Sequence, residues 1–216
     1  MLEKRTYTIQ ELSNIIGTAD KSATDRKLKN YEIAFTNTGR GKELTYTITD
    51  IPDRFKVFCV FDLGFNPHTN FTKLRDFLFY LLGDDDFNWR PMEMMEEYLR
   101  IAGKGMSRQT VSKYIEKIKG LNLVAGTDFV YYRVYKNFGV QAHEIITREE
   151  YSKAWSIYWD AKERGYDSRA AYSCMYNAFQ GVPRKQRKLE QNALCQDILS
   201  LLSDLISESF LLENNG

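Results

Sequence analysis

The segment from Gly103 to Val124 carries side chains whose types and spacing suit the recognition of DNA. It reads GKGMSRQTVSKYIEKIKGLNLV. Short hydroxyls bond phosphate oxygens, forked guanidinium and amide groups read guanine and adenine, and lysines neutralise flanking phosphates. These groups follow one another as Ser107, Arg108, Gln109, Thr110, Lys113, Lys117 and Lys119. The segment therefore predicts a surface that binds double-stranded DNA.

A helix must hold these groups in line, and the apolar residues of the same segment predict one. Val111, Tyr114, Ile115 and Ile118 recur at helical spacing, and Ser107 is a favourable N-cap before them. The first turn of such a helix is the part that points into a major groove.

A β-hairpin is expected after this helix. The stretches 129–136 and 140–146 alternate in the manner of strands around a turn at 137–139. Basic side chains near the tip of such a hairpin approach the DNA backbone, and here they are Arg133 and Lys136. Helix, turn, helix and hairpin is the order of a winged helix, so a winged-helix unit is expected over 70–147.

The pattern S-R-Q-T-V-x-x-Y-I resembles the recognition helix of winged-helix regulators and replication initiators. The likeness extends into the first strand and covers about thirty-five residues. It implies that the helix from Ser107 to Lys119 reads the major groove.

The first 51 residues repeat the same order of elements. Thr8 and Glu11 form a capping-box pair, and Ser22 is expected to cap a second helix. The segment GRGK then predicts the turn of a hairpin. Basic residues on the second helix and at the hairpin tip are candidate DNA contacts, namely Arg26, Lys27, Arg40 and Lys42. Because Asp20 and Asp25 lie beside them, a protein contact is an equal alternative for this unit.

The whole chain is expected to be α+β and mainly α, with two tandem winged-helix-like units and a C-terminal helical extension. The expected boundaries are 1–51 for the first unit, 52–69 for a connector, 70–147 for the second unit and 148–216 for the helical region. FKVFCVF in the connector is expected to be a strand. The final helix is expected over 187–211, and the basic run PRKQRK before it is either an exposed loop or a phosphate contact.

A leucine-rich seam lies in this final helix. Leu194, Ile198, Leu201 and Leu205 are spaced close to 3.5 residues apart, as in a helix packing face. The seam either packs on the preceding helices or forms a homodimer. A homodimer is the favoured expectation because it suits a two-fold DNA site.

Composition argues against several other classes. The formal net charge is only +1, and basic residues concentrate between Lys104 and Lys136. No apolar run spans a bilayer and the N-terminus lacks a signal peptide, so a cytoplasmic protein with reduced cysteines and no membrane partner is expected. Neither His68 nor His143 lies in a recognisable catalytic motif, and the cysteines do not have the spacing of metal ligands. Neither an enzyme nor a metal or cofactor is expected.

Two such units followed by helices resemble the replication initiators of plasmids and related proteins of bacterial mobile elements. The resemblance implies a sequence-specific DNA-binding protein of a phage or plasmid, either a replication initiator or a transcriptional regulator. A second hypothesis is an inhibitor of a bacterial defence nuclease, as anti-CRISPR proteins are, acting by protein–protein contact. The low net charge and the acidic stretch from Asp84 to Glu97 suit such a partner. Pairing of Arg108 with Glu93 or Glu97 would give that arginine a merely structural role.

Overall fold

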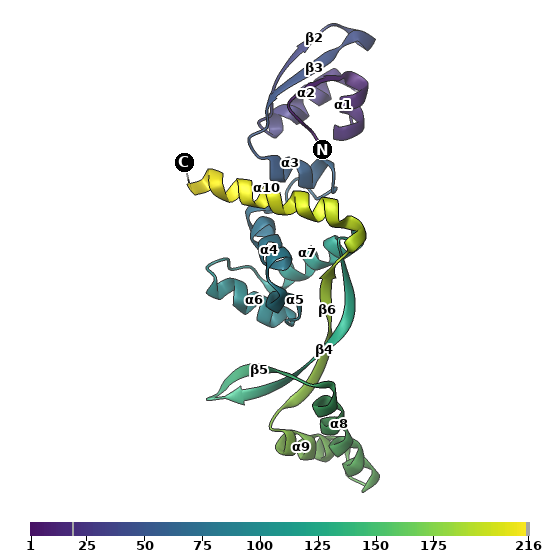
Figure 1. Cartoon of the computed structure of the whole chain (residues 1–216), viewed down its shortest axis with the longest axis vertical. Coiled ribbons are helices and arrows are strands. Elements are labelled where there is room, and N and C mark those ends of the chain that lie inside the picture. The colour runs from purple at the N-terminus through teal and green to yellow at the C-terminus, as the bar shows by residue number, and fades with distance from the viewer. Residues whose placement is uncertain (19, 215–216) are drawn as a thin grey trace.

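A computed structural model describes residues 1–18 and 20–214 and shows an elongated α+β molecule that is mainly helical, in agreement with the sequence (Figure 1). The N-terminal unit lies at one end, a helical centre follows, and a long β-ribbon leads to a pair of helices at the far end. None of the described helices is both long enough and apolar enough to cross a bilayer.

The N-terminal unit packs two helices on a three-stranded antiparallel sheet of order β1-β3-β2. Its elements are β1 (Thr6–Thr8), α1 (Ile9–Ile16), α2 (Lys21–Asn30), β2 (Ala34–Thr38), η1 (Gly41–Glu43) and β3 (Thr45–Asp50). The capping box of Thr8 and Glu11 is confirmed. The cap of α2 is Asp20 rather than Ser22, because the Asp20 carboxylate accepts from the Ala23 amide at 2.8 Å. The sequence did not predict strand β1, which is only three residues long.

Helix α3 (Arg54–Phe61) replaces the strand expected for FKVFCVF. That prediction was wrong because six of the seven residues of the run are apolar, so it has no period that separates a strand from a helix. Val57 belongs to the core of the N-terminal unit, whereas Phe55 and Phe58 belong to the core of the central unit. The expected connector is therefore a helix shared between two cores.

The central unit is a bundle of helices. It comprises α4 (Phe71–Gly83), α5 (Asp85–Asn88), α6 (Met92–Ile101), α7 (Arg108–Gly120) and, from the end of the chain, η2 (Ala193–Cys195) and α10 (Gln196–Asn214). Asn70 caps α4 by accepting from the Lys73 amide at 2.9 Å. The predicted α10 seam is divided, since Leu205 is buried while Leu194 and Ile198 are exposed. The core-facing residues of α10 are Leu199, Leu202, Leu205 and Ile206.

The second sheet has the order β5-β4-β6 and is antiparallel throughout. It consists of β4 (Val124–Asn137), β5 (Val140–Ile146) and β6 (Val182–Gln191), with α8 (Arg148–Glu163) and α9 (Ser168–Phe179) inserted between β5 and β6. The helix expected to begin at residue 187 is wrong here, because 187–191 lies in β6 and pairs with β4. Residues of β6 and α10 belong to the central core. The boundary expected at residue 148 therefore separates segments that pack together. Residues 215–216, the end of the expected helical region, lie outside the described part.

Candidate nucleic-acid interface

Helix α7 presents one polar face to solvent and buries the other. Ser107 caps it as predicted, since its hydroxyl accepts from the Thr110 amide at 3.3 Å. The Tyr114 hydroxyl donates to the Asn70 carbonyl at 3.1 Å, which fastens α7 to the start of α4. The buried face is apolar and consists of Val111, Tyr114, Ile115 and Ile118. The first turn of the helix is thereby held rigidly while its polar side chains remain outside.

The predicted reading residues lie on this outer face. Ser107, Arg108 and Gln109 are exposed in the first turn, and Thr110 is half-buried beside them. Glu97, one of the two acids considered as partners for Arg108, accepts from Arg100 at 3.2 Å, and its carboxylate has acceptor sites for a second guanidinium group. The side chain of Glu93 lies outside the described part of the structure.

The lysines of α7 divide into two kinds. Lys113 and Lys119 are exposed on the outer face. Lys117 is half-buried, and its ammonium lies 5.5 Å from the centroid of the Phe65 ring. A cation over an aromatic face is attracted to the ring, so the Lys117 ammonium interacts with Phe65 within the folded protein. We therefore leave Lys117 out of the candidate phosphate contacts.

The two candidate residues of the β4–β5 hairpin have different surroundings. Lys136 is exposed near the tip, where Asn137 pairs with Val140. Arg133 is not at the tip, because it donates to the Glu144 carboxylate of β5 and to the Phe179 carbonyl of α9. These bonds give Arg133 a structural role in joining α9 to the sheet.

The N-terminal candidates divide in the same way. Arg26 on α2 and the hairpin residues Arg40 and Lys42 are exposed. Lys27 instead donates to the Ile16 carbonyl and lies 5.3 Å from the Phe61 ring centroid, so it closes the end of α1. Figure 1 places the β2–β3 hairpin at one end of the molecule and the β4–β5 hairpin on the other side of the helical centre, so the predicted residues do not form one continuous surface.

The acids beside α2 have structural functions. Asp20 is the helix cap, and Asp25 accepts from Lys21 and from the Tyr46 hydroxyl, both at 2.8 Å. Burial opposes ionisation of Asp25, but these two hydrogen bonds hold its pKa below the ordinary value. The negative charges on this side of the N-terminal unit are therefore partly neutralised.

The basic run PRKQRK was expected before the final helix, whereas the structure places it in strand β6. Arg184, Lys185 and Arg187 are exposed and project from a strand that pairs with β4. The signal, the run PRKQRK, was visible in the sequence. Its strand conformation was not, because the partner strand lies about fifty residues earlier in the chain.

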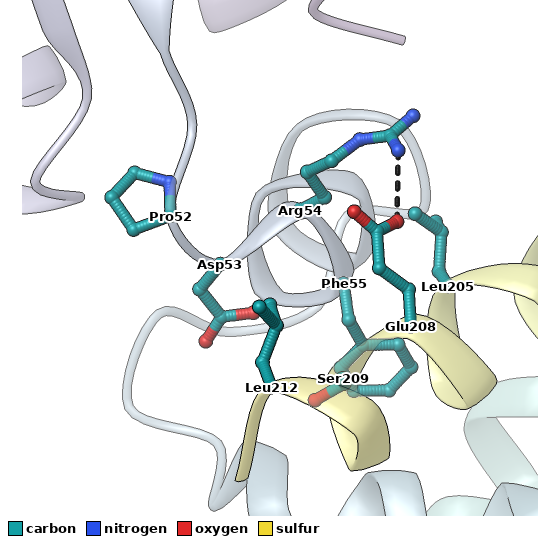
Figure 2. Close-up of a pocket in the computed structure, with 8 residues that line it drawn as sticks. All are labelled: Pro52, Asp53, Arg54, Phe55, Leu205, Glu208, Ser209 and Leu212. Carbon is teal, nitrogen blue, oxygen red and sulfur yellow. Dashed lines mark hydrogen bonds and ion pairs between the residues drawn. The ribbon is translucent and has the colours of Figure 1, made fainter. Parts of the chain in front are cut away.

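A cleft of about 270 Å³ separates the start of α3 from the end of α10. Figure 2 shows Arg54 of α3 reaching Glu208 of α10, with 2.8 Å between the guanidinium and carboxylate groups. Phe55 and Ser209 lie beneath this bridge. The cleft holds neither histidine nor cysteine, and across the described residues no three of His, Cys, Asp and Glu gather as a metal-binding group. We interpret it as the joint between the two units.

Comparison with protein-family models, with curated proteins and with solved structures gave no match.

Proposed function

We propose that the protein is a sequence-specific DNA-binding protein of a phage or plasmid, acting as a replication initiator or a transcriptional regulator. The observation that carries this proposal is the outer face of α7. Its capped first turn offers Arg108 and Gln109 to solvent, while the opposite face is fixed in the core. A rigid helix with exposed forked side chains in its first turn is what major-groove reading requires.

The neighbouring elements support a winged-helix interpretation of the centre. Helices α4, α6 and α7 precede the antiparallel strands β4 and β6, in the order of a three-helix unit followed by its wing. In this interpretation α6 and α7 form the helix-turn-helix, and β5, α8 and α9 are an insertion between the wing strands. The proposal assigns base reading to Arg108 and Gln109 and backbone contacts to Lys113 and Lys119.

Selection from a random-duplex library tests the assignment. Wild-type protein is expected to enrich one motif, and Arg108→Ala with Gln109→Ala is expected to lose about 1–3 kcal/mol of discrimination per base pair read. Lys113→Ala with Lys119→Ala should keep the motif and weaken binding to all duplexes alike. Lys153→Ala, an exposed lysine on α8, is the matched control and should change neither property.

Three results would contradict the assignment. If wild type enriches no motif, α7 is not a reading helix. If the motif survives in the Arg108 and Gln109 variant, another element reads the bases. If Lys113→Ala with Lys119→Ala binds as tightly as wild type, the outer face of α7 does not lie against the backbone.

The far end of the molecule favours a second candidate, an inhibitor of a bacterial defence nuclease. Trp159 and Tyr166 there are 58% and 49% exposed, and Tyr172 lines an apolar hollow between α8 and α9. Exposed aromatic residues are typical anchors of protein–protein contacts. This candidate predicts that the protein blocks DNA cleavage by an RNA-guided nuclease at equimolar amounts, and that Trp159→Ala relieves the block. Full cleavage in the presence of excess protein would exclude inhibition of the nuclease tested.

A further inference from the structure

The basic residues of β6 form a row beside an exposed aromatic ring. We call Lys185 and Arg187 the β6 strip, since Arg184, the residue before Lys185, projects to the opposite face of the ribbon. Lys185 pairs with Tyr131 and Arg187 with Phe129 across the ladder. Directly opposed residues of an antiparallel pair point to the same face, so Lys185, Arg187 and Phe129 share one side of the ribbon.

Phe129 is 42% exposed and is flanked by two cations. The Lys185 ammonium lies 4.9 Å and the Arg187 guanidinium 5.3 Å from its ring centroid. Arg187 also donates to the Gly126 carbonyl at 3.1 Å. These contacts hold two positive groups in fixed positions at the surface instead of leaving them on freely moving chains.

The carboxylates of the described residues form no ion pair with the strip. No described residue forms an ion pair with Arg184, Lys185 or Arg187, whereas their neighbour Lys188 lies 3.7 Å from Asp85. Lys185 and Arg187 lie on one face and repel each other, and an anion bound between them would relieve that repulsion.

Protection of a sheet edge is the simplest alternative. Strand β6 is an edge of its sheet, and charged residues on an edge discourage pairing with other chains. That role does not require a half-exposed phenylalanine held between the cations. It also does not explain the position of the strip, which ends two residues before Leu189, a member of the core that holds α7 in place.

The spacing of the strip fits a nucleic-acid backbone. Lys185 and Arg187 are two residues apart, which is about 6.7 Å along a strand. One strand of B-DNA carries one phosphate per about 3.4 Å of helix axis, so two cations about 6.7 Å apart can each face a different phosphate of one strand. The ribbon also extends away from α7 toward the far end of the molecule, as Figure 1 shows.

We propose that the β6 strip is a second, sequence-independent phosphate-binding surface, which contacts duplex DNA outside the site read by α7. This inference rests on the proposed function. It predicts that the protein covers more DNA than one helix reads, and that the additional length contributes affinity without specificity.

The test compares one variant that carries both Lys185→Gln and Arg187→Gln, the strip variant, with wild type on two duplexes. One duplex holds only the motif selected by wild type, and the other extends it by one helical turn on each side. On the long duplex the strip variant should bind more weakly, with a salt slope reduced by about 0.9 for each phosphate that the variant no longer neutralises. On the short duplex it should match wild type, and its selected motif should be unchanged.

Lys188→Gln is the matched control, because it removes a lysine of the same strand that already faces Asp85, and it should bind as wild type. Circular dichroism of the strip variant should show the wild-type spectrum. If wild type binds DNA and the strip variant has the same salt slope on the long duplex, this inference fails while the proposed function stands. An equal loss of affinity on the short duplex also overturns it, since the strip would then belong to the reading site. Failure of wild type to bind any duplex overturns both.

Discussion

One buried hydrogen bond fastens α2 to the sheet of the N-terminal unit. The Tyr46 hydroxyl donates to the Asp25 carboxylate at 2.8 Å, and Tyr46 is fully buried. Burial, assisted by the adjacent carboxylate, raises the pKa of Tyr46 well above its ordinary value of 10.0. The folded protein therefore retains this proton at a pH where the unfolded chain releases it.

This difference predicts a loss of stability at high pH. A pKa that is raised in the folded state contributes stability that is present below pH 10 and is lost as the pH rises above it. The free energy of unfolding should fall by about 1.4 kcal/mol per pH unit from this group alone. Tyr46→Phe should remove that part of the slope and cost about 1 kcal/mol at neutral pH.

Denaturant unfolding between pH 8 and pH 11 measures the effect as the difference between wild type and variant. Tyr166→Phe is the control, because it removes the hydroxyl of a tyrosine that is 49% exposed and has no part in the Tyr46–Asp25 hydrogen bond. Parallel curves for wild type and Tyr46→Phe above pH 10 would show that Tyr46 titrates alike in the folded and unfolded chains.

At the scale of elements, α3 joins two cores through opposite faces. Val57 packs in the N-terminal core and Phe58 in the central core, although they are adjacent in sequence. Since both side chains belong to one short helix, loss of either core removes part of the support of the other. The N-terminal and central units are thus coupled by packing and not only by the chain.

This coupling predicts one cooperative unfolding transition for the two units. Val57→Ala should cost about 2 kcal/mol and Phe58→Ala about 3–5 kcal/mol. Each variant should accelerate amide hydrogen exchange in both β3 and α4. Val140→Ala and Phe138→Ala are matched controls at sites that are 67% and 101% exposed, and they should have little effect. Faster exchange in the N-terminal unit alone after Val57→Ala would mean that the two units unfold separately.

Some helix starts were predicted from local sequence patterns alone. Helix α7 was predicted with its cap because Ser107 and the stripe from Val111 to Ile118 are local signals that tertiary packing confirms. The capping box of α1 was predicted for the same reason. Local chemistry therefore specifies these helix starts.

The elements predicted wrongly depend on distant partners. Residues 187–191 contain two basic and two polar or acidic side chains around Leu189, and no local preference makes them a strand. Pairing with β4 imposes that conformation. The candidate site shows the same limit, since the sequence offered Lys27 and Arg133 as free cations and only the folded chain reveals the carbonyl groups that bind them.

At the scale of the whole molecule, the far end is an insertion into the β4–β6 pair. Among the described residues, the central core contains Val124 and Leu189 and none of the hydrophobic residues between them. The chain leaves the centre along β4 and returns along β6, and Phe129 and Arg187 lie opposite each other on the two strands. The centre is therefore complete without the residues beyond this pair.

Removal of residues 130–186 tests this independence. Asn-Gly in their place would join Phe129 to Arg187 by a two-residue hairpin turn, which suits the twist of paired strands. The shortened protein should unfold cooperatively with a Tm within a few degrees of wild type, and it should select the same DNA motif. Adding Leu189→Ala should lower stability by about 2–5 kcal/mol, because that residue is in the core. An insoluble or molten shortened protein would show that the far end stabilises the centre.

The β4–β6 ribbon also places α8 and α9 far from α7. Strand β4 has 14 residues, so its arm is roughly 46 Å long at about 3.3 Å per residue. A rotation of about 10° at its base, beside α7, displaces the far end by roughly 8 Å, whereas the β6 strip near the base moves much less. With a ligand held at the base, such a rotation would move α8 and α9 much further than it would move the ligand.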